Sequence, residues 1–521
     1  MKINKNFFVY AAIILYLLLF LKIDYRFITE ITCCGDDFDY FIHAKTIALD
    51  NDFDYSNNLI SDSYFYKYGN VIAPKGFVGS GILAAPFLYF GNILNDFYTN
   101  SDILNYQIFL YSLSAVFYFL MSIILLNKSF ALLKINVSKF FIFLMFFGSG
   151  LPYYAFERYS MTHTYEVFIN SVLFFLVIAL HKESNSIKIN FLILAISLSV
   201  CMGLLVRWTN YYIFFLPLLY KLLISEIEPY SKKVINRPIT YFGVLSSSYI
   251  FYWLSKNIYG RFILDPRKIY GESKEIKELL TPEYGVVNIV FGYCSDILNI
   301  LFGNEFGIFW TSPILFIFIP LVVIFIFKKK YKIALILSII FLQIFGVVII
   351  WQSTASSYGY RYLFSLIPIS IIIFLILNKN HQYNIFKSYL IPFSIFSSIS
   401  VLFFETNSKT QLSLIDVPNS FGKLTKYTQP DYVSGYINSF NNIESYQIIF
   451  LTSFLGALIF KILQSLAGYE DLLEILSSYG LPVSNQDFLE FYLNIYEIEY
   501  FKFIFVILFF WVFTVKLYKK F

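Results

Sequence analysis

The feature that most constrains the fold of this chain is a series of apolar runs, each long enough to cross a lipid bilayer. A helix needs about 20 apolar residues to cross the hydrocarbon core, where every backbone polar group must be satisfied within the segment. The sequence therefore predicts an all-α polytopic membrane protein with roughly 11–13 transmembrane helices. The runs are residues 7–23, 104–126, 139–155, 165–181, 189–206, 209–225, 238–255, 312–327, 333–351, 362–378 and 388–404, followed by the shorter apolar stretches 446–463 and 500–516.

Composition agrees with this prediction. Hydrophobic residues make up 58% of the 521 residues, charged residues make up only 14%, and the mean hydropathy is +0.65, which excludes an ordinary soluble domain. The formal net charge of +5 comes largely from Lys and Arg beside the ends of apolar runs. Basic residues in that position mark the cytoplasmic side of a membrane, so we expect no nucleic-acid partner.

The charged connections predict which side of the membrane each loop faces. Lys-bearing connections fall on alternate turns, as a cytoplasmic assignment requires; they hold Lys128, Lys134 and Lys139, then Lys182 and Lys188, then the run 328–332. The outer face then receives a first loop at 24–103, a second at 256–287 and a third at 352–361. Residues 288–311 extend the second outer loop to 311 as an interfacial or re-entrant segment, because counting them as a span would put the run 328–332 outside.

The ends of the chain follow the same argument. The first run, 7–23, has a basic start but no small-x-small cleavage site after it, so we expect a retained signal anchor with a cytoplasmic N-terminus. We predict that residues 1–404 form the transmembrane catalytic module. Residues 405–521 are predicted to be an outer loop plus C-terminal membrane helices, whose role and sidedness the sequence leaves open.

The first outer loop holds the strongest candidate for chemistry. Between residues 24 and 102 it has eleven acidic residues against four basic ones, and Asp36, Asp37 and Asp39 cluster just beyond the first span. Apolar residues from Phe38 to Leu49 recur at helical spacing, which predicts an amphipathic interfacial helix. Asp36 and Asp37 would lie at its N-terminus, where the helix dipole favours negative charge. Residues 73–87 are too interrupted by Gly and Pro for a clean span, which indicates a second interfacial helix.

Asp36 and Asp37 are therefore candidate catalytic residues, although a charge cluster in isolation is more often a solvated loop. A carboxylate at a membrane surface can act as a general base toward a hydroxyl or amine, and a second one can tune it or hold a divalent metal. Asp36 is the preferred base because it follows Gly35 and begins the helix. The identity of any metal stays open.

Cations and a histidine are the candidates for substrate binding. Lys75, Arg207 and Arg361 are predicted at the outer edge of the membrane, where guanidinium groups would bind phosphate oxygens in pairs; the alternative is snorkelling to the surface. Tyr358 lies in the aromatic segment before Arg361. His163 ends the polar turn 157–163 and is either a substrate contact or an interfacial hydrogen-bonding residue. In the same turn Glu157 and Arg158 suggest a local ion pair.

The order of these motifs resembles the GT-C type of integral-membrane glycosyltransferases, the superfamily that includes protein O-mannosyltransferases and lipid A aminoarabinose transferases. The resemblance covers residues 1–370. It rests on Gly35-Asp36-Asp37 after the first span, Asn51-Asp52-Phe53-Asp54, Lys75-Gly76, Tyr153-Tyr154 with Met161-Thr162-His163, the step from Gly203 to Arg207, Gly307-Ile308-Phe309 before Ser312-Pro313, and Tyr358-Gly359-Tyr360-Arg361-Tyr362 before Pro368.

The resemblance implies a GT-C-like fold, a polyprenyl-phosphate sugar as donor, and an acidic residue of the first outer loop, Asp36 or Asp37, as the base. Two departures are that Asp37 stands where the acidic partner is often Glu, and that the C-terminal region matches no part of the family. The acceptor, a glycan, lipid or protein, is therefore left open.

We thus expect an inverting glycosyltransferase of the cell envelope, an enzyme of a bacterial inner (cytoplasmic) membrane with its site facing outside. A polytopic lipid or glycan transporter is the main rival, in which the membrane-edge charges would line a path. A non-catalytic membrane scaffold is the third possibility. Consumption of a polyprenyl-phosphate sugar by the purified protein would separate the enzyme from both.

Overall fold

The protein is described from a computed structural model. It describes residues 5–20, 36–57, 65–97, 106–137, 139–208, 210–229, 234, 236–265, 267–270, 286–303, 307–316, 318–351, 360–378 and 384–404, and in the C-terminal region 446, 449–450, 453–468, 470–472, 474, 503–505 and 507–508. The outer loop predicted at 405–445 and residues 271–285 of the second outer loop lie outside the described residues.

The fold is almost entirely helical, which agrees with the predicted all-α membrane protein. Within the described residues three helices are long and apolar enough to cross a membrane: α5 (Tyr106–Leu132), α7 (His163–Lys182) and α8 (Ser186–Val206). At a rise of about 1.5 Å per residue, a 20-residue helix such as α7 is about 30 Å long, the thickness of a hydrocarbon core. The larger number of spans, the GT-C fold and the orientation stay predictions.

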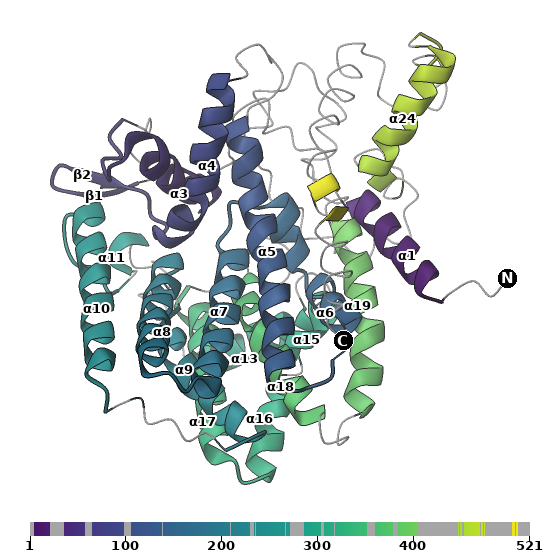
Figure 1. Cartoon of the computed structure of the whole chain (residues 1–521). Helices are drawn as coiled ribbons and strands as arrows, with labels where there is room; N and C mark the ends of the chain where they lie inside the picture. The colour runs from purple at the N-terminus through teal and green to yellow at the C-terminus, as the bar shows by residue number, and fades with distance from the viewer. Residues whose placement is uncertain are drawn as a thin grey trace. The chain divides into compact units, whose positions relative to one another are not determined.

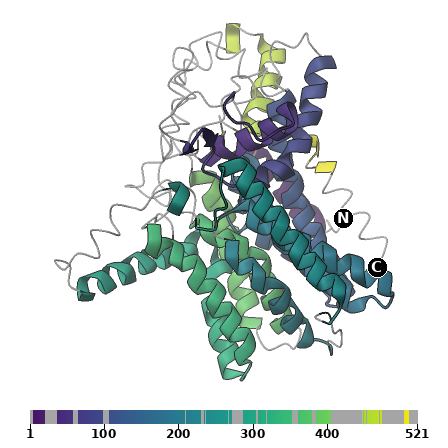
Figure 2. The same cartoon turned by 90° about the vertical axis from the view of Figure 1, so that its left-hand side faces the viewer.

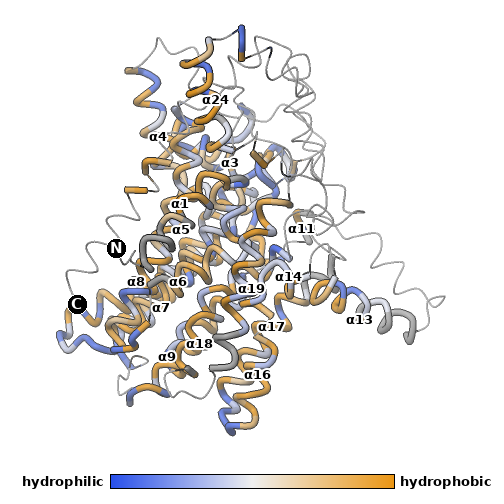
Figure 3. The backbone as a smooth tube through the Cα atoms, turned by 90° about the vertical axis from the view of Figure 1, so that its right-hand side faces the viewer, coloured by the Kyte–Doolittle hydropathy of each residue, from blue (hydrophilic) through white to orange (hydrophobic). Residues whose placement is uncertain are grey.

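The remaining helices mostly follow the predicted apolar runs (Figure 1). They are α1 (Lys5–Phe20), α3 (Asp36–Lys45), α4 (Gly79–Phe97), α6 (Lys139–Phe147), α9 (Leu216–Ser225), α10 (Pro238–Tyr259), α11 (Arg267–Tyr270), α13 (Val286–Phe302), α14 (Ile308–Thr311), α15 (Pro313–Phe316), α16 (Phe318–Phe327), α17 (Tyr331–Trp351), α18 (Ile367–Asn378), α19 (Asn384–Phe404) and α24 (Phe454–Ala467). The hydropathy of the tube is high along α16, α17 and α18 (Figure 3).

Three predicted spans are not single α-helices. The run 139–155 divides at Gly148–Gly150 into α6 and a π-helical turn, η2 (Tyr153–Glu157). The runs 209–225 and 362–378 each begin with a 3₁₀ helix, η3 (Asn210–Phe215) and η4 (Arg361–Leu366), before α9 and α18. Pro217 and Pro368 stand just inside α9 and α18. Because proline has no N–H to continue the α-helical ladder backward, the preceding turn tightens at both sites.

The predicted helix of the first loop is present, and α3 begins at Asp36 as expected. Three acidic residues occupy its first turn and His43 and Lys45 its last, an arrangement that complements the helix dipole. The helix continues as a π-helical turn, η1 (Thr46–Asp50), and ends at Asn51, whose φ of 60° is left-handed. Most of α3 is buried in protein, so it lacks the solvent-facing polar side of the predicted amphipathic helix.

Glycine allows α3, α4 and α8 to approach closely. A Cβ atom on Gly79, at the start of α4, would lie 2.4 Å from the backbone carbon of Leu205 in α8. A Cβ atom on Gly81 would lie 2.5 Å from the Cβ of His43 in α3. The second helix predicted in this loop is also present, as α4, which runs continuously from Gly79 to Phe97 with Pro86 inside it. Its interfacial position stays a prediction. Its glycines serve packing, and they position α3 beside the end of α8.

A small β-hairpin departs from the all-α prediction. Strand β1 (Tyr66–Tyr68) pairs antiparallel with β2 (Val71–Ala73) across a two-residue turn, with Tyr68 opposite Val71. The hairpin packs on the end of α10, where Arg261 donates to the Tyr66 hydroxyl at 2.8 Å and lies over the Tyr68 ring at 4.5 Å. The Lys75-Gly76 segment follows shortly after β2, so this contact also fixes where that segment begins.

The described residues form two compact units, each described by itself. The larger unit comprises residues 35–89 and 114–398 and contains every candidate site residue that the structure describes. In it, α7, α8 and α10 pack side by side, and α13 projects outward from α14 (Figures 2 and 3). The smaller unit comprises 1–34, 90–113 and 399–521, and in it α1 packs on α24. The predicted division at residue 404 stays a prediction.

Candidate functional site

Charged side chains from five distant segments meet at one end of the α7–α8 pair. Glu166 lies in the first turn of α7, Arg207 follows the last residue of α8, and Arg361 begins η4. Arg158 lies between η2 and α7, and the acidic start of α3 completes the group. We call Asp36, Asp37, Arg158, Glu166, Arg207 and Arg361 the charged cluster.

Asp37 forms an ion pair with Arg158 in which both side chains are buried. Its Oδ2 atom accepts hydrogen bonds from Nε of Arg158, at 3.0 Å, and from the terminal Nη2 of the same residue. The side chains are only 1% and 7% exposed. The Oδ1 atom of Asp37 is buried without a hydrogen-bond partner in the described part of the chain. The side chain of Glu157 lies outside the described part of the chain, so the local Glu157–Arg158 pair suggested by the sequence stays a prediction.

Asp36, the predicted base, is the most accessible carboxylate of the cluster. Its side chain is 27% exposed, and its Oδ2 atom lies 3.2 Å from Nη1 of Arg361. Arg361 is buried and also contacts the sulfur of Met161 at 3.9 Å. Its Nε atom has no hydrogen-bond partner in the described residues. The structure thus brings together two residues that the sequence proposed separately, one as base and one as phosphate ligand.

Arg207 is held by Glu166, a residue that the sequence argument did not select. Nη1 of Arg207 lies 3.3 Å from Oε1 of Glu166, which also accepts a hydrogen bond from the Thr162 hydroxyl at 2.8 Å. Glu166 is 1% exposed, and its Oε2 atom is buried without a partner among the described residues. A carboxylate this deep in an apolar helix is costly unless paired, and Arg207 provides the pairing charge.

Tyr362 links the two arginines that were predicted to bind phosphate. The guanidinium carbon of Arg207 lies 4.3 Å from the ring centroid of Tyr362, and that of Arg361 lies 5.4 Å from it. Cations within about 6 Å of an aromatic face are attracted by its quadrupole. The ring therefore holds two positive groups near each other, and the side chain of Tyr362 also shares a hydrogen bond with Arg361.

His163 lies beside this cluster but contacts none of its charged groups by a hydrogen bond that the structure describes. Its ring packs edge-on against Tyr154 at 4.5 Å and Phe364 at 6.1 Å between centroids. It is fully buried, and its Nδ1 atom has no hydrogen-bond partner in the described residues. These two ring contacts are aromatic packing, and the predicted contact of His163 with substrate stays a prediction.

A second buried network fixes the Lys75-Gly76 segment against α3. Oδ2 of Asp39 accepts a hydrogen bond from the Gly76 amide at 2.9 Å, and the Gly76 carbonyl accepts from the Tyr259 hydroxyl at 2.7 Å. The same carbonyl lies 3.0 Å from Nε2 of His43, while Nδ1 of His43 lies 2.7 Å from the Tyr55 hydroxyl. Since a carbonyl can only accept, Nε2 carries the proton and Nδ1 accepts from Tyr55.

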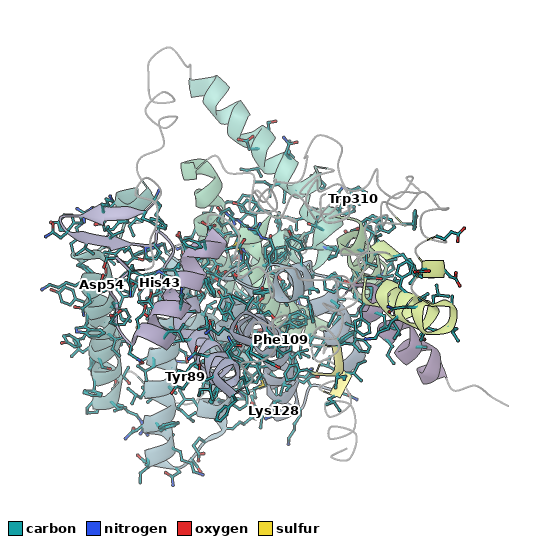
Figure 4. The ribbon with its side chains drawn as sticks, turned by 90° about the horizontal axis from the view of Figure 1, so that it is seen from above. His43, Asp54, Tyr89, Phe109, Lys128 and Trp310 are labelled. Carbon is teal, nitrogen blue, oxygen red and sulfur yellow. The ribbon has the colours of Figure 1, made fainter. Side chains whose placement is uncertain are left out.

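Burial shifts the titration of both ionisable members of this network. Desolvation, with a smaller contribution from the charge of Asp36, raises the pKa of Asp39 to about 8. Desolvation lowers the pKa of His43 to about 4. His43 lies on the same side as Asp54, the neighbour of Tyr55, in the view from above (Figure 4). Both groups are therefore neutral near pH 7, which suits a buried position.

Lys75 lies next to this network, since its carbonyl accepts from the indole N–H of Trp208 at 3.1 Å. Its positive charge lowers the pKa of Asp39 slightly against the larger effect of burial. Tyr358 lies outside the described residues, so its predicted role stays a prediction. Within the described residues no group of three or more His, Cys, Asp or Glu side chains is placed to hold a metal ion.

Comparison with known proteins adds no relative, because no family model, curated protein or solved structure matches this chain. The GT-C resemblance therefore stays a prediction from its motifs. Two members of the charged cluster had weak signals in the sequence. Glu166 is an acidic residue inside an apolar run of spanning length, a position that by itself indicates function or pairing. Arg158 was visible only as part of a polar turn.

Proposed function

We propose that this protein is an inverting membrane glycosyltransferase that moves a sugar from a polyprenyl-phosphate donor to an acceptor at the extracytoplasmic face. The observation that carries the proposal is the position of Asp36. It is a partly exposed carboxylate 3.2 Å from Arg361, and a second guanidinium, that of Arg207, contacts the same Tyr362 ring. A candidate base and two candidate phosphate ligands thus meet at one end of a spanning-length helix.

The chemistry assigns one task to each charge. Asp36 would accept a proton from an acceptor hydroxyl or amine as that atom attacks the anomeric carbon of the sugar. The bond between that carbon and the phosphate oxygen would break, and the phosphate would leave with the electron pair. Arg207 and Arg361 would stabilise the growing negative charge on that oxygen, so part of their effect belongs to turnover.

The location supports a lipid-linked donor. A polyprenyl chain must remain in the bilayer while its headgroup meets protein cations at the membrane edge. α7 is long and apolar enough to cross a membrane, and its first turn carries Glu166, the partner of Arg207. Of the Lys residues predicted to be cytoplasmic, Lys182 is the last residue of α7 and Lys188 lies in the first turn of the next helix, α8. The positive-inside rule then assigns the charged cluster to the outer face.

Transport of a lipid or glycan is a second candidate, favoured by one observation. Helices broken into short 3₁₀ and α segments, such as η3–α9 and η4–α18, border the charged cluster, and broken helices are common in transporters. A transporter would move the lipid across a vesicle membrane without breaking the bond between sugar and phosphate, which makes the two functions distinguishable.

The test is turnover of undecaprenyl-phosphate sugars by the purified full-length protein in nanodiscs. We expect the wild type to release undecaprenyl phosphate and the Asp36→Asn variant to lose roughly 10²–10⁴-fold in rate, as for other acid–base groups. Asp54→Asn is the matched control, because Asp54 is an exposed carboxylate of the same loop whose hydrogen bonds, among the described residues, stay within its own turn. Wild-type turnover in Asp36→Asn would exclude Asp36 as the base.

Lipid movement in vesicles gives the second readout. Scrambling of a fluorescent polyprenyl-phosphate lipid with no sugar released from any donor tested would favour the transporter over the enzyme. Arg361→Lys sharpens the assignment of the phosphate site, because lysine keeps the charge but loses the two parallel donors. We expect this variant to be impaired in both donor KM and kcat.

A further inference from the structure

In this structure the carboxylate of Asp36 forms an ion pair with the guanidinium of Arg361, the group that a donor phosphate would need to bind. We propose that the Asp36–Arg361 ion pair is a self-occupied anion site, in which the donor phosphate displaces Asp36 from Arg361 and thereby frees the base. The inference rests on the proposed function, because it names that anion as the headgroup of a polyprenyl-phosphate lipid.

The charge balance of the cluster favours such an exchange. Arg158, Arg207 and Arg361 each contact one carboxylate, those of Asp37, Glu166 and Asp36 in turn. The six side chains therefore sum to no net charge when all are ionised. An incoming phosphate would add an uncompensated negative charge to a largely buried site, which is unfavourable unless one carboxylate gives up its arginine.

Burial identifies Asp36 as the carboxylate that leaves. Its side chain is 27% exposed, whereas those of Asp37 and Glu166 are each 1% exposed. A displaced Asp36 can rotate toward solvent and be hydrated. A displaced Asp37 or Glu166 would remain an unpaired charge in the protein interior, at a much higher cost in free energy. Asp36 is also the first residue of α3 as the structure describes that helix.

Arg361 has an N–H donor that an incoming phosphate could use. Its Nη1 atom faces Asp36, but its buried Nε atom has no hydrogen-bond partner among the described residues. Guanidinium groups bind oxyanions best through two parallel N–H donors, and the contact with Asp36 engages one terminal nitrogen. A phosphate that used both Nε and a terminal nitrogen would satisfy the unpaired donor that Asp36 leaves unused.

Exchange couples donor binding to base activation. While Asp36 neutralises Arg361, neither side chain is free for its proposed task. When the phosphate takes the arginine, the carboxylate loses its counter-charge and becomes a better proton acceptor. The acceptor substrate is then deprotonated only after the donor is in place. Glu166 acts differently, since it keeps Arg207 positioned against Tyr362 and does not exchange.

The test is the affinity of undecaprenyl monophosphate, which carries no sugar to transfer, for the full-length protein in detergent micelles. We expect Asp36→Asn to bind this lipid at least about 5-fold more tightly than the wild type, the lower end of usual coupling effects, because the internal competitor has lost its charge. Glu166→Gln should bind more weakly, because Arg207 loses the carboxylate that orients it. Asp54→Asn is again the control and should bind as the wild type does.

Unchanged or weaker binding by Asp36→Asn, with normal binding by the wild type, would overturn the exchange. Asp36→Ser serves as a second variant that also removes the charge, and size-exclusion profiles report whether each variant folds. Inorganic phosphate is the second probe. A preference of Asp36→Asn for inorganic phosphate, without any binding of the lipid by either protein, would support the exchange and overturn the lipid donor of the proposed function. Binding of neither probe by any variant would overturn both.

Discussion

The two ends of α7 carry ion pairs of opposite character. At its N-terminal end the three arginines of the charged cluster that pair with carboxylates are 7% to 11% exposed. Near its C-terminal end Lys182 pairs with Glu228 at 2.7 Å, and Lys330 pairs with Glu226 at 3.1 Å, with the lysines 34% and 47% exposed. One end uses arginine in the interior, and the other uses lysine at the surface.

Buried arginine pairs and exposed lysine pairs differ in what they can contribute. Arginine is weakly hydrated and offers several fixed donors, so it tolerates burial and can bind an anion in a defined geometry. Exposed lysine pairs contribute little to stability, and lysines at helix ends mark the cytoplasmic side instead. The buried end therefore holds charges at a cost in free energy, whereas the lysines of the exposed end are those from which the sequence predicts the cytoplasmic side.

Breaking the buried Asp37–Arg158 pair should have the largest effect on stability. Arg158→Leu would leave the Asp37 carboxylate buried and unpaired, and we expect a loss of about 3–5 kcal/mol in the free energy of unfolding. Replacing both residues by Leu should recover most of that loss. Thermal unfolding in detergent measures both variants, and a double variant as unstable as Arg158→Leu would contradict an uncompensated charge as the cause.

The Asp39–His43 network should give a smaller, pH-dependent effect. Asp39 has a folded pKa raised to about 8, so its contribution to stability is complete below its ordinary value of 3.8 and is lost as the pH rises toward 8. His43 has a folded pKa lowered to about 4, so its contribution is complete above 6.5 and is lost as the pH falls toward 4. The two opposing trends offset each other between about 4 and 6.5, and only the Asp39 loss continues between 6.5 and 8.

Asp39→Asn isolates the first trend. The amide oxygen can still accept the hydrogen bond of Gly76, but it does not ionise, so this variant should gain stability relative to the wild type as the pH rises from 6.5 to 8. Charged neighbours of Asp39 are Asp36, which raises its pKa, and Lys75, which lowers it. Unfolding temperatures of both proteins across this range provide the measurement, and parallel curves would show that Asp39 does not titrate there.

Removing an exposed pair should have the smallest effect. Lys182→Met is expected to cost less than about 1 kcal/mol, with the remaining difference from the wild type shrinking as salt is added. Lys182 also lowers the pKa of Glu228 through its hydrogen bond, so the small cost should decrease at low pH, where Glu228 is protonated. A loss as large as that of Arg158→Leu would remove the contrast between the two ends.

Local features of the sequence determined the helices. Apolar runs predict spanning helices because hydropathy and helix length act within one segment, and α5, α7 and α8 follow the runs at 104–126, 165–181 and 189–206. The start of α3 at Asp36 was also predictable, because acidic residues stabilise a helix N-terminus locally. The interruption of the run 139–155 was readable in principle from Gly148 and Gly150, but apolarity outweighed it.

Tertiary structure alone decided how the charges pair. Asp37 meets Arg158 across 121 positions, and Arg361 meets Asp36 across a still longer stretch of chain. No local pattern encodes such contacts, so the sequence suggested only a Glu157–Arg158 pair and predicted Arg207 and Arg361 as phosphate ligands without naming a carboxylate partner for either. The burial of these side chains could not be predicted from the sequence either. An Asp residue is solvated in a loop or buried in the interior depending on which distant segments pack against it. Residue types and helices follow from near neighbours, whereas charge partners and exposure depend on distant segments brought together by folding.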